Sequence, residues 1–446
     1  MSFYFFLSMA NIHIKTYGCS NNTHESEVMA GLLQQKGYHL TPLEKDADVV
    51  LLNVCTVKGD DQALRQVQEV SQQHKEKKII VAGCVTKELK AALLKQYPQI
   101  SLLNTHNIQK VALVAGETLA GNVVSVRGMD SGTKLLLPKI RTHPLINILP
   151  VSSGCTNHCS FCSVKLIKGN VVSYPVEQIA AEIQKSVADG VKEIYLTSQD
   201  TAAYGADTGI GLCHVLRSAL AIPGEFMIRL GMGNPNHVVH FVDELIELFK
   251  HPKMYKFLHI PLQSGSDRVL SSMKREYTVN QYRYLVRKFK EAIPEITIAT
   301  DIICGYPTET ADEFLETLRI VEETKPNIIN ISRYKKRRNT PAFLLEQVPA
   351  SVKHERCKIL SAAFKEITYR ENLLWVGWEG NVIINETGRF RTLKGRNYCY
   401  KQIIVPGTLD NYPLGSIVRV RVVDVSAFDL FCEVVEKKVS LRVAED

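Results

Sequence analysis

Three cysteines in the middle of the chain lie close enough in sequence to share one short loop. Cys155, Cys159 and Cys162 follow the spacing C-x3-C-x2-C, directly after Gly154. This spacing can place three sulfurs around one metal centre, and cysteine thiolates are the usual ligands of iron–sulfur clusters. A [4Fe–4S] cluster has four irons, so three cysteines leave one iron free to bind a small molecule. We therefore expect these cysteines, the loop trio, to hold an open, reactive cluster.

A zinc site is the alternative for the same loop, with His158 as the fourth ligand. Closed tetrahedral sites of cysteine and histidine hold zinc structurally. His158 directly precedes Cys159, however, and adjacent ligands would strain a tetrahedral cage. The spacing instead resembles that of the radical S-adenosylmethionine (SAM) enzymes, in which SAM binds the open iron through its amino and carboxylate groups. The aromatic Phe161 before the last cysteine fits that pattern.

Composition excludes two classes of protein. The chain of 446 residues has 11 cysteines, an odd and modest number, and no secretory signal. These features indicate a reducing compartment, and we expect a cytoplasmic protein that uses cysteines for metals rather than disulfides. No stretch reaches the roughly 20 apolar residues that span a membrane, so no membrane partner is expected. The apolar residues 1–9 are interpreted as an over-extended start, with Met9 a candidate initiator beside Met1.

The N-terminal part, residues 11–125, alternates short apolar strands with helical segments. This rhythm predicts a Rossmann-like parallel sheet covered by helices. Cys19, Cys55 and Cys84 each follow a predicted strand. Because ligands bind at the carboxyl edge of open parallel sheets, we expect these cysteines, the N-terminal trio, to form a second metal site. The alternative is that they are buried structural cysteines.

Residues 126–147 are predicted to be a linker, and residues 148–370 contain six strand–helix units. Six such units predict an incomplete (β/α)6 barrel, whose active site lies at the carboxyl ends of the strands. Polar side chains at these ends are candidates for binding SAM, although each can equally be a strand-end cap. Together with Phe161 the candidates are Gln199, Gln263, Ser264, Asp301, Ser332 and Tyr334.

Residues 371–438 alternate apolar and polar side chains with a period of two, which predicts a small antiparallel β-barrel. Basic residues lie among its tyrosines and tryptophans. They are Arg389, Arg391, Lys394, Arg396 and Lys401. Such a mixture suits RNA, since cations contact phosphates while rings stack on bases. A solvated basic face is the alternative, and the net charge of +8 favours a polyanionic partner only weakly.

Several segments together resemble the radical SAM methylthiotransferase family, and the resemblance extends from about residue 11 to 437. They are Thr16-Tyr-Gly-Cys19 with the residues up to Met29, Asn53-Val-Cys55-Thr-Val-Lys58, Val81-Ala-Gly-Cys84 and the loop trio. The C-terminal barrel resembles the family's TRAM domain, an RNA-binding module. Segments 165–175 and 332–342 resemble the archaeal and eukaryotic branch, which modifies N6-threonylcarbamoyladenosine next to the tRNA anticodon.

The chain departs from that branch at two places. The branch usually has arginine where Lys168 stands, and Pro-Arg-Pro-Gly where Lys336-Arg337-Arg338-Asn339 stands. We expect the additional charges to affect tRNA contact or substrate choice.

The resemblance implies two [4Fe–4S] clusters, one on the loop trio and an auxiliary one on the N-terminal trio. It further implies that one electron from the cluster on the loop trio cleaves SAM to methionine and a 5′-deoxyadenosyl radical. This radical removes the hydrogen at C2 of the adenine before a methylthio group is transferred there. No general base is expected, because a C2–H bond is not acidic. The implied partners are tRNA, an electron donor such as ferredoxin or flavodoxin, and a sulfur source.

Three other interpretations remain open from the sequence. The substrate can be N6-isopentenyladenosine in tRNA or an aspartate of a ribosomal protein, and the chain can instead be an RNA-binding iron–sulfur redox sensor. His237 and His259 are interpreted as structural. The other cysteines are interpreted as core residues, and they are Cys213, Cys304, Cys357, Cys399 and Cys432.

Overall fold

The structure is a computed structural model that describes residues 10–55, 59–126, 128 and 132–435. The interpretation of Met1 and Met9 and the motif residues 56–58 therefore lie outside the described part. None of the helices in the described ranges combines the length and the apolar character needed to cross a membrane.

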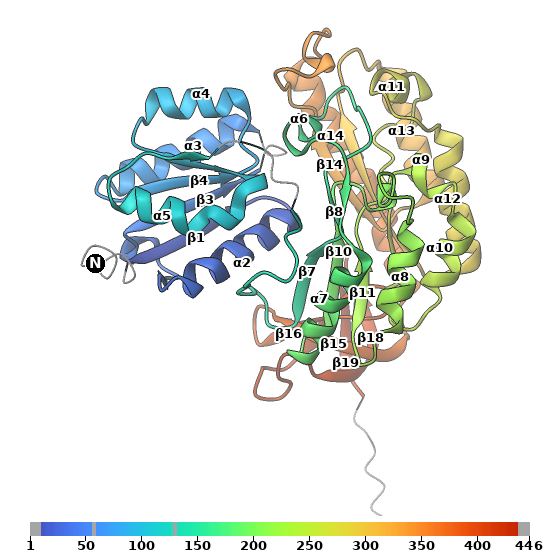
Figure 1. Ribbon diagram of the computed structural model, residues 1–446. Helices are drawn as coiled ribbons and strands as arrows, with labels where there is room; N and C mark the ends of the chain where they lie inside the picture. Colours follow the sequence, from blue (N-terminus) through green and yellow to red (C-terminus); the bar gives the residue numbers. More distant parts are fainter. Residues whose placement is uncertain (1–9, 56–58, 127, 129–131, 436–446) are drawn as a thin grey trace, which may run out of the picture.

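The N-terminal part is a six-stranded sheet with the order β2-β1-β3-β4-β5-β6, and all of its pairings are parallel (Figure 1). The strands are β1 (Asn11–Tyr17), β2 (His39–Leu40), β3 (Val49–Val54), β4 (Lys78–Gly83), β5 (Ser101–Asn104) and β6 (Ser125–Val126). The helices are α2 (Ser20–Gln35), α3 (Asp60–Gln73), α4 (Lys87–Gln96) and α5 (Val111–Leu119), with 3-10 turns at Glu44–Asp46 and Thr105–Lys110. Every residue of β3 is buried, because helices cover both faces of the sheet. The predicted Rossmann-like sheet is confirmed.

Helix α2 faces the rest of the molecule and buries polar side chains. The Glu27 carboxylate accepts hydrogen bonds from the backbone N–H (2.8 Å) and hydroxyl (2.7 Å) of Thr142. A side chain at Gly31 would lie 2.3 Å from the backbone of Pro138, so only glycine permits this close approach. The segment before β7 (Ile146–Pro150) is therefore packed onto α2.

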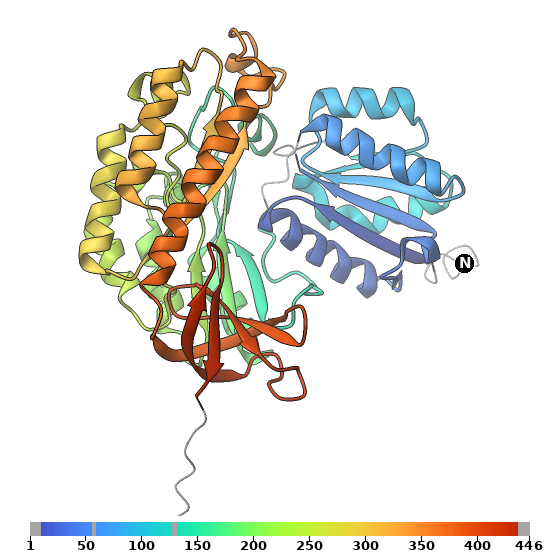
Figure 2. The same cartoon turned by 180° about the vertical axis from the view of Figure 1, so that it is seen from behind.

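The central part contains six parallel strands in two three-stranded groups, β11-β10-β7 and β12-β13-β14, linked by a bridge between Ile228 and Met254. The further strands are β10 (Glu193–Thr197), β11 (Met227–Leu230), β12 (Phe257–His259), β13 (Thr297–Cys304) and β14 (Ile328–Arg333). Helices α7 (Val176–Ala188), α8 (Leu212–Ala221), α9 (Pro235–Val238), α10 (Val242–Phe249), α11 (Asp267–Ser272), α12 (Val279–Ala292), α13 (Ala311–Thr324) and α14 (Ala350–Leu373) surround them (Figures 1 and 2). A short hairpin of β8 (Ser152–Ser153) and β9 (Val172–Ser173) flanks α6 (Val164–Lys168). The incomplete (β/α)6 barrel is confirmed.

The C-terminal part is a closed five-stranded barrel at the end of the long helix α14 (Figure 2). Its strands are β15 (Glu379–Thr387), β16 (Thr392–Arg396), β17 (Gln402–Pro406), β18 (Ile417–Val425) and β19 (Leu430–Val434). Four pairings are antiparallel as predicted, but β17 and β19 pair in parallel. β18 crosses over to pair with β15, so β19 closes the barrel by running alongside β17 in the same direction.

One residue that the sequence placed on an RNA-binding face, Lys401, is buried instead. The ammonium of Lys401 bonds the side-chain oxygen of Asn372 at 3.0 Å. The hydroxyl of Tyr400 donates a 2.7 Å hydrogen bond to that of Tyr195, and its ring contacts Phe257 at the amino-terminal end of the central strands. The prediction that Lys401 faces RNA is therefore wrong. The half-buried Tyr400 docks the small barrel against the large one.

The other four basic residues of the predicted RNA-binding face divide into two groups. Lys394 pairs with Glu386 at 3.2 Å, and the Arg396 guanidinium lies over the ring of Tyr400. Arg389 and Arg391 are exposed. Of the five cysteines expected in the core, only Cys357 is partly exposed and the others are buried.

Candidate functional site

All six cysteines of the two trios line one cavity of about 780 Å3 between the N-terminal sheet and the central barrel. Cys19, Cys55 and Cys84 follow β1, β3 and β4, which are neighbours in the sheet. The carboxyl ends of parallel strands meet at one edge, so these thiols come together there. Within the described residues, no three side chains of His, Cys, Asp or Glu are placed to hold a single metal ion. A [4Fe–4S] cluster distributes its cysteines over separate irons and needs a wider spacing.

Local geometry holds the N-terminal trio at this edge. Cys19 precedes the first turn of α2, and its thiol donates to the side-chain oxygen of Asn22 at 3.5 Å. A hydrogen bond with Cys55, aided by backbone N–H groups at the start of α2, lowers the pKa of the Cys19 thiol to about 6. Burial instead raises the pKa of Cys84. The trio thus includes one thiol that ionises readily.

The loop trio lies between β8 and α6, and glycine allows the chain to turn there. Gly154 has a φ of 84°, and a side chain on it would lie 1.9 Å from the carbonyl oxygen of Asn170. The backbone N–H of Gly154 donates a 2.8 Å hydrogen bond to the side-chain oxygen of Gln199, and Lys165 donates to the carbonyl of Cys155. The loop is therefore anchored by hydrogen bonds that leave its sulfurs facing the cavity.

Two residues that contact the loop sulfurs were not found from the sequence. Arg275 Nη1 donates a hydrogen bond to Cys159 Sγ at 3.1 Å. Asn157 Nδ2 lies 3.8 Å from Cys155 Sγ and donates to Asp200 at 3.1 Å. Neither residue carries a sequence signal, because Arg275 follows helix α11 and Asn157 sits inside the loop without a strand before it. His158, the fourth ligand of the zinc alternative, is exposed and does not line the cavity.

Six of the seven residues predicted to bind SAM line the same cavity. They are Phe161, Gln199, Gln263, Asp301, Ser332 and Tyr334. Ser264 does not line the cavity. It is fully buried behind Gln263, and its hydroxyl accepts a hydrogen bond from the backbone N–H of Ser266 at 3.3 Å. The structure thus gives Ser264 a local structural contact and no access to a ligand.

Two cavity-lining residues have buried oxygens without a hydrogen-bond partner among the described residues. They are Gln263 Oε1 and the hydroxyl of Tyr334. Gln263 also has a φ of 65°, a conformation that costs energy for a residue other than glycine and that often marks a ligand site. Buried polar atoms are normally paired. The cavity therefore offers polar groups that a bound molecule such as SAM would satisfy.

Asp301 is held as a carboxylate on the same wall. Burial alone would raise the pKa of Asp301, but hydrogen bonds from His259 (3.0 Å) and Asn330 (2.8 Å) outweigh it and lower that pKa. His237 bonds the hydroxyl of Thr156 at 3.0 Å. Both histidines therefore support neighbouring residues, as expected.

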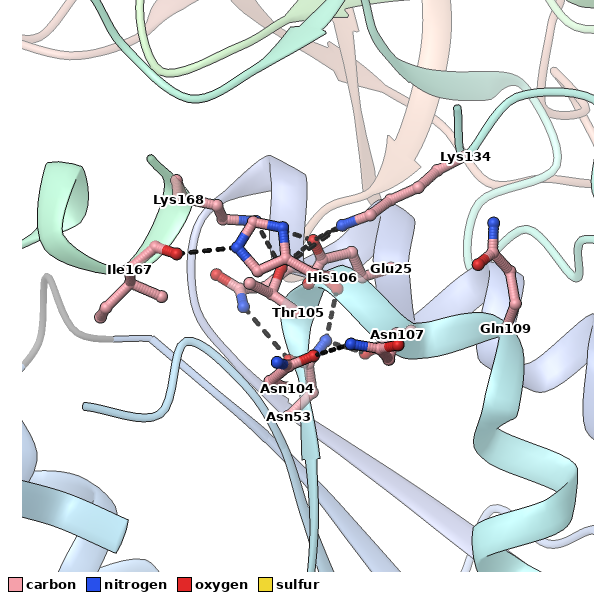
Figure 3. Close-up of polar contacts among 12 residues, drawn as sticks. Glu25, Asn53, Asn104, Thr105, His106, Asn107, Gln109, Lys134, Ile167 and Lys168 are labelled. Atoms are coloured by element: carbon pink, nitrogen blue, oxygen red, sulfur yellow. Dashed lines mark hydrogen bonds and ion pairs between the residues drawn. The ribbon is translucent and has the colours of Figure 1, made fainter. Parts of the chain in front are cut away.

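A buried ionic cluster borders the cavity on the side of the N-terminal sheet (Figure 3). Glu25 Oε1 accepts from the ammonium groups of Lys134 at 2.5 Å and Lys168 at 2.8 Å. The hydroxyl of Thr105 donates to the same oxygen at 2.6 Å. Lys168 also lines the cavity that contains the six thiols. We call Lys134, Glu25 and Lys168 the Lys–Glu–Lys triad.

A second cavity of about 1390 Å3 adjoins the first and is lined by α3, α4 and the segment after β14. The basic run 335–338 lies along it, and Lys335 and Arg337 line both cavities. Lys335 and Arg338 are exposed. A polyanion that reaches the thiol-lined cavity from this side would therefore meet positive charge.

Comparison with known families and proteins adds an independent result. Residues 11–104 match the Uncharacterized protein family UPF0004, and residues 149–321 match the Radical SAM superfamily. The chain is 37% identical to a probable threonylcarbamoyladenosine tRNA methylthiotransferase of Methanothermobacter thermautotrophicus, over 95% of this chain and 99% of that protein. It is 40% identical to the Homo sapiens threonylcarbamoyladenosine tRNA methylthiotransferase, over 89% of this chain and 69% of that protein.

Solved structures support the fold alone. The radical S-adenosylmethionine methyltransferase TsrM from Kitasatospora setae, solved with its tryptophan substrate and a SAM analogue, has a TM-score of 0.55 at 12% identity. The similarity covers 75% of each chain.

Proposed function

The chain belongs to the family of threonylcarbamoyladenosine tRNA methylthiotransferases, and we propose that it adds a methylthio group to C2 of N6-threonylcarbamoyladenosine in tRNA. The convergence of six cysteines on one cavity carries this proposal. Two open three-thiolate sites that share one cavity suit a reaction in which one site starts the chemistry and the other supplies the group transferred. A structural role for the N-terminal trio would not require its thiols to face the loop trio.

In this proposal the loop trio holds one [4Fe–4S] cluster and the N-terminal trio holds the other. When bound, these clusters and SAM supply the radical and sulfur-transfer chemistry. The protein's own residues bind and orient: Gln263 and Tyr334 offer their unpaired oxygens to SAM, and the Asp301 carboxylate suits a ribose hydroxyl. The cavity of about 780 Å3 falls in the usual range for small-molecule sites and is large enough for SAM beside a base.

The substrate's own charge fits the mouth of this cavity. N6-threonylcarbamoyladenosine carries a carboxylate, whereas N6-isopentenyladenosine carries a neutral apolar group. Lys335 and Arg337 line both cavities at their junction. Cations at that position would attract the carboxylate of N6-threonylcarbamoyladenosine. The isopentenyl group carries no charge, so they would not attract it. The target base has to be turned out of its stack to reach the sulfurs.

We further propose a cytoplasmic location and, as partners, an electron donor such as ferredoxin or flavodoxin and a sulfur source. The C-terminal barrel is proposed to act as a TRAM-like RNA-binding domain through Arg389 and Arg391, which are exposed. The domain limits 11–125, 148–370 and 371–438 around the linker 126–147 are proposed with it.

Nucleoside mass spectrometry of tRNA from cells with and without the gene tests the proposed function. The 2-methylthio derivative of N6-threonylcarbamoyladenosine should disappear without the gene and return when the gene is restored. Restoration with a variant that lacks the loop trio (C155A, C159A and C162A) should not bring it back. Loss of a methylthiolated isopentenyladenosine instead would assign the alternative tRNA substrate. Unchanged tRNA nucleosides would refute both and leave the ribosomal-protein aspartate and the redox sensor.

A further inference from the structure

The Lys–Glu–Lys triad carries one more positive than negative charge on side chains that are almost fully buried. The exposed fractions of the side chains of Glu25, Lys134 and Lys168 are 0%, 6% and 2%. Among the residues that the structure describes, Glu25 is the only carboxylate that bonds the ammonium group of Lys134 or of Lys168. Burial lowers the pKa of Lys134 to about 8, which still leaves it protonated at neutral pH. An unbalanced buried charge costs several kcal/mol unless a counter-charge lies near it.

The triad joins three separate parts of the chain. Glu25 belongs to α2 of the N-terminal sheet, Lys168 ends α6 behind the loop trio, and Lys134 lies between the two regions. Figure 3 shows both ammonium groups directed at Glu25, with Thr105 beside them. A neighbouring hydrogen bond of 2.8 Å joins His106 to the carbonyl of Ile167. The surplus charge is thus fixed in position by contacts from both sides of the cavity.

The thiols of the N-terminal trio face the same cavity as Lys168 and can balance this charge. Lys168 lines the cavity together with Cys19, Cys55 and Cys84. A [4Fe–4S] cluster with three thiolates is anionic and becomes more so when it is reduced. A fixed cation beside it therefore favours the reduced form, in the way that local charge sets cluster potentials.

We propose that the Lys–Glu–Lys triad is the built-in counter-charge of the cluster on the N-terminal trio and raises its reduction potential. Lys168 and Lys134 are positioning residues in this account, since neither has to touch substrate. The inference rests on the proposed function in one respect, namely that the N-terminal trio holds a cluster.

A redox titration followed by electron paramagnetic resonance tests the inference on the full-length, anaerobically reconstituted protein. The variant C155A, C159A and C162A serves as the parent, so that the signal comes from the N-terminal trio. K168M and K134M each leave a neutral Lys–Glu pair. Both should lower the ratio of reduced to oxidised cluster about tenfold at a fixed potential, which corresponds to about 59 mV for one electron.

Three further variants separate charge from damage to the fold. K168R keeps the charge and should leave the potential unchanged, as should K95M, which removes an exposed lysine of α4. E25Q removes the anion, so the potential should stay or rise. The inference alone would be overturned if the reduction potential fell in E25Q as much as in K168M. It would also be overturned if K168M retained its iron and its reduction potential did not fall. A parent without iron on the N-terminal trio would overturn the proposed function as well.

Discussion

The guanidinium of Arg275 donates a hydrogen bond to the sulfur of Cys159, with 3.1 Å between Nη1 and Sγ. The two residues lie 116 positions apart in the chain. Arg275 also donates to the side-chain oxygen of Asn234 and lies over the ring of Tyr277 at 5.0 Å, which fixes its direction. Hydrogen bonds to cluster sulfurs tune the reactivity of a cluster.

Replacing Arg275 with methionine should therefore slow SAM cleavage, by about 10- to 100-fold, as is usual when a residue that supports a metal ligand is lost. The measurement is 5′-deoxyadenosine released by the reconstituted protein after reduction with dithionite. R275K keeps the charge and should recover part of the rate. R287M, at an exposed position of α12, serves as a control. An unchanged rate in R275M would show that this hydrogen bond is structural only.

Replacing Cys19 with alanine should separate the two halves of the reaction. The N-terminal trio loses one of its three ligands, so about half of the iron should be lost from a protein with two clusters. SAM cleavage should persist on the loop trio, while the methylthio product disappears. Iron assay and product analysis by mass spectrometry measure these effects, with C357A as a partly exposed control cysteine. Retained methylthio product in C19A contradicts the two-cluster assignment.

Charge removal along the second cavity should weaken tRNA binding. K335A and R338A each remove an exposed cation from the cavity lining. If each contacts a phosphate, its loss should raise Kd and reduce the slope of log K against log salt by about 1. Fluorescence anisotropy with an anticodon stem-loop at several salt concentrations measures both. R287A, on α12, should change neither, and an equal effect in R287A would indicate a diffuse effect of net charge.

Tyr400 should contribute strongly to stability because it fastens the C-terminal barrel to the central one. Its ring lies 4.9 Å from that of Tyr255 and 5.0 Å from that of Phe257. Truncation to alanine should cost about 2 kcal/mol, less than the roughly 3–5 kcal/mol for an aromatic ring in a core, because Tyr400 is half-buried. The shift of the urea midpoint measures the loss. The control F390A removes a ring that is 95% exposed and should cost nothing measurable.

Glu313 should make stability depend on pH below its ordinary pKa. Hydrogen bonds from Arg268, with further bonds at the start of α13, lower the pKa of Glu313 to about 2 from an ordinary value of 4.5. Because the folded pKa is depressed, the contribution is complete above pH 4.5 and is lost as pH falls toward 2. The difference in unfolding free energy between the parent and E313Q should shrink over that range.

Much of the candidate site could be predicted from local sequence. A cysteine that ends a strand of a parallel sheet has to lie at the carboxyl edge, so the two trios followed from strand patterns and spacing. Gln263, Asp301 and Tyr334 followed from the same rule for barrel strands. That rule places a residue at the end of a strand, but it does not say which way the side chain turns. Ser264, directly after Gln263, therefore faces away from the cavity.

The C-terminal barrel shows the same limit. Alternation with a period of two predicted its strands, and basic residues such as Lys401 were predicted to face RNA. Packing reverses that interpretation for Lys401, which is buried and bonds Asn372 at the end of α14. The contacts of Tyr400 with Tyr255 and Phe257 likewise depend on where the two barrels meet. No local sequence pattern predicts where the central barrel and the C-terminal barrel come into contact.

The sequence by itself determined the chemistry available to this protein: six thiols in two trios, a parallel sheet and a barrel with polar strand ends. These features depend on residue type and on spacing within a few positions. Only the tertiary structure decided that both trios face one cavity, that Arg275 reaches Cys159, and that Lys134 and Lys168 share Glu25. Contacts between residues so far apart in the chain arise from the packing of whole elements, because burial and charge balance are settled there.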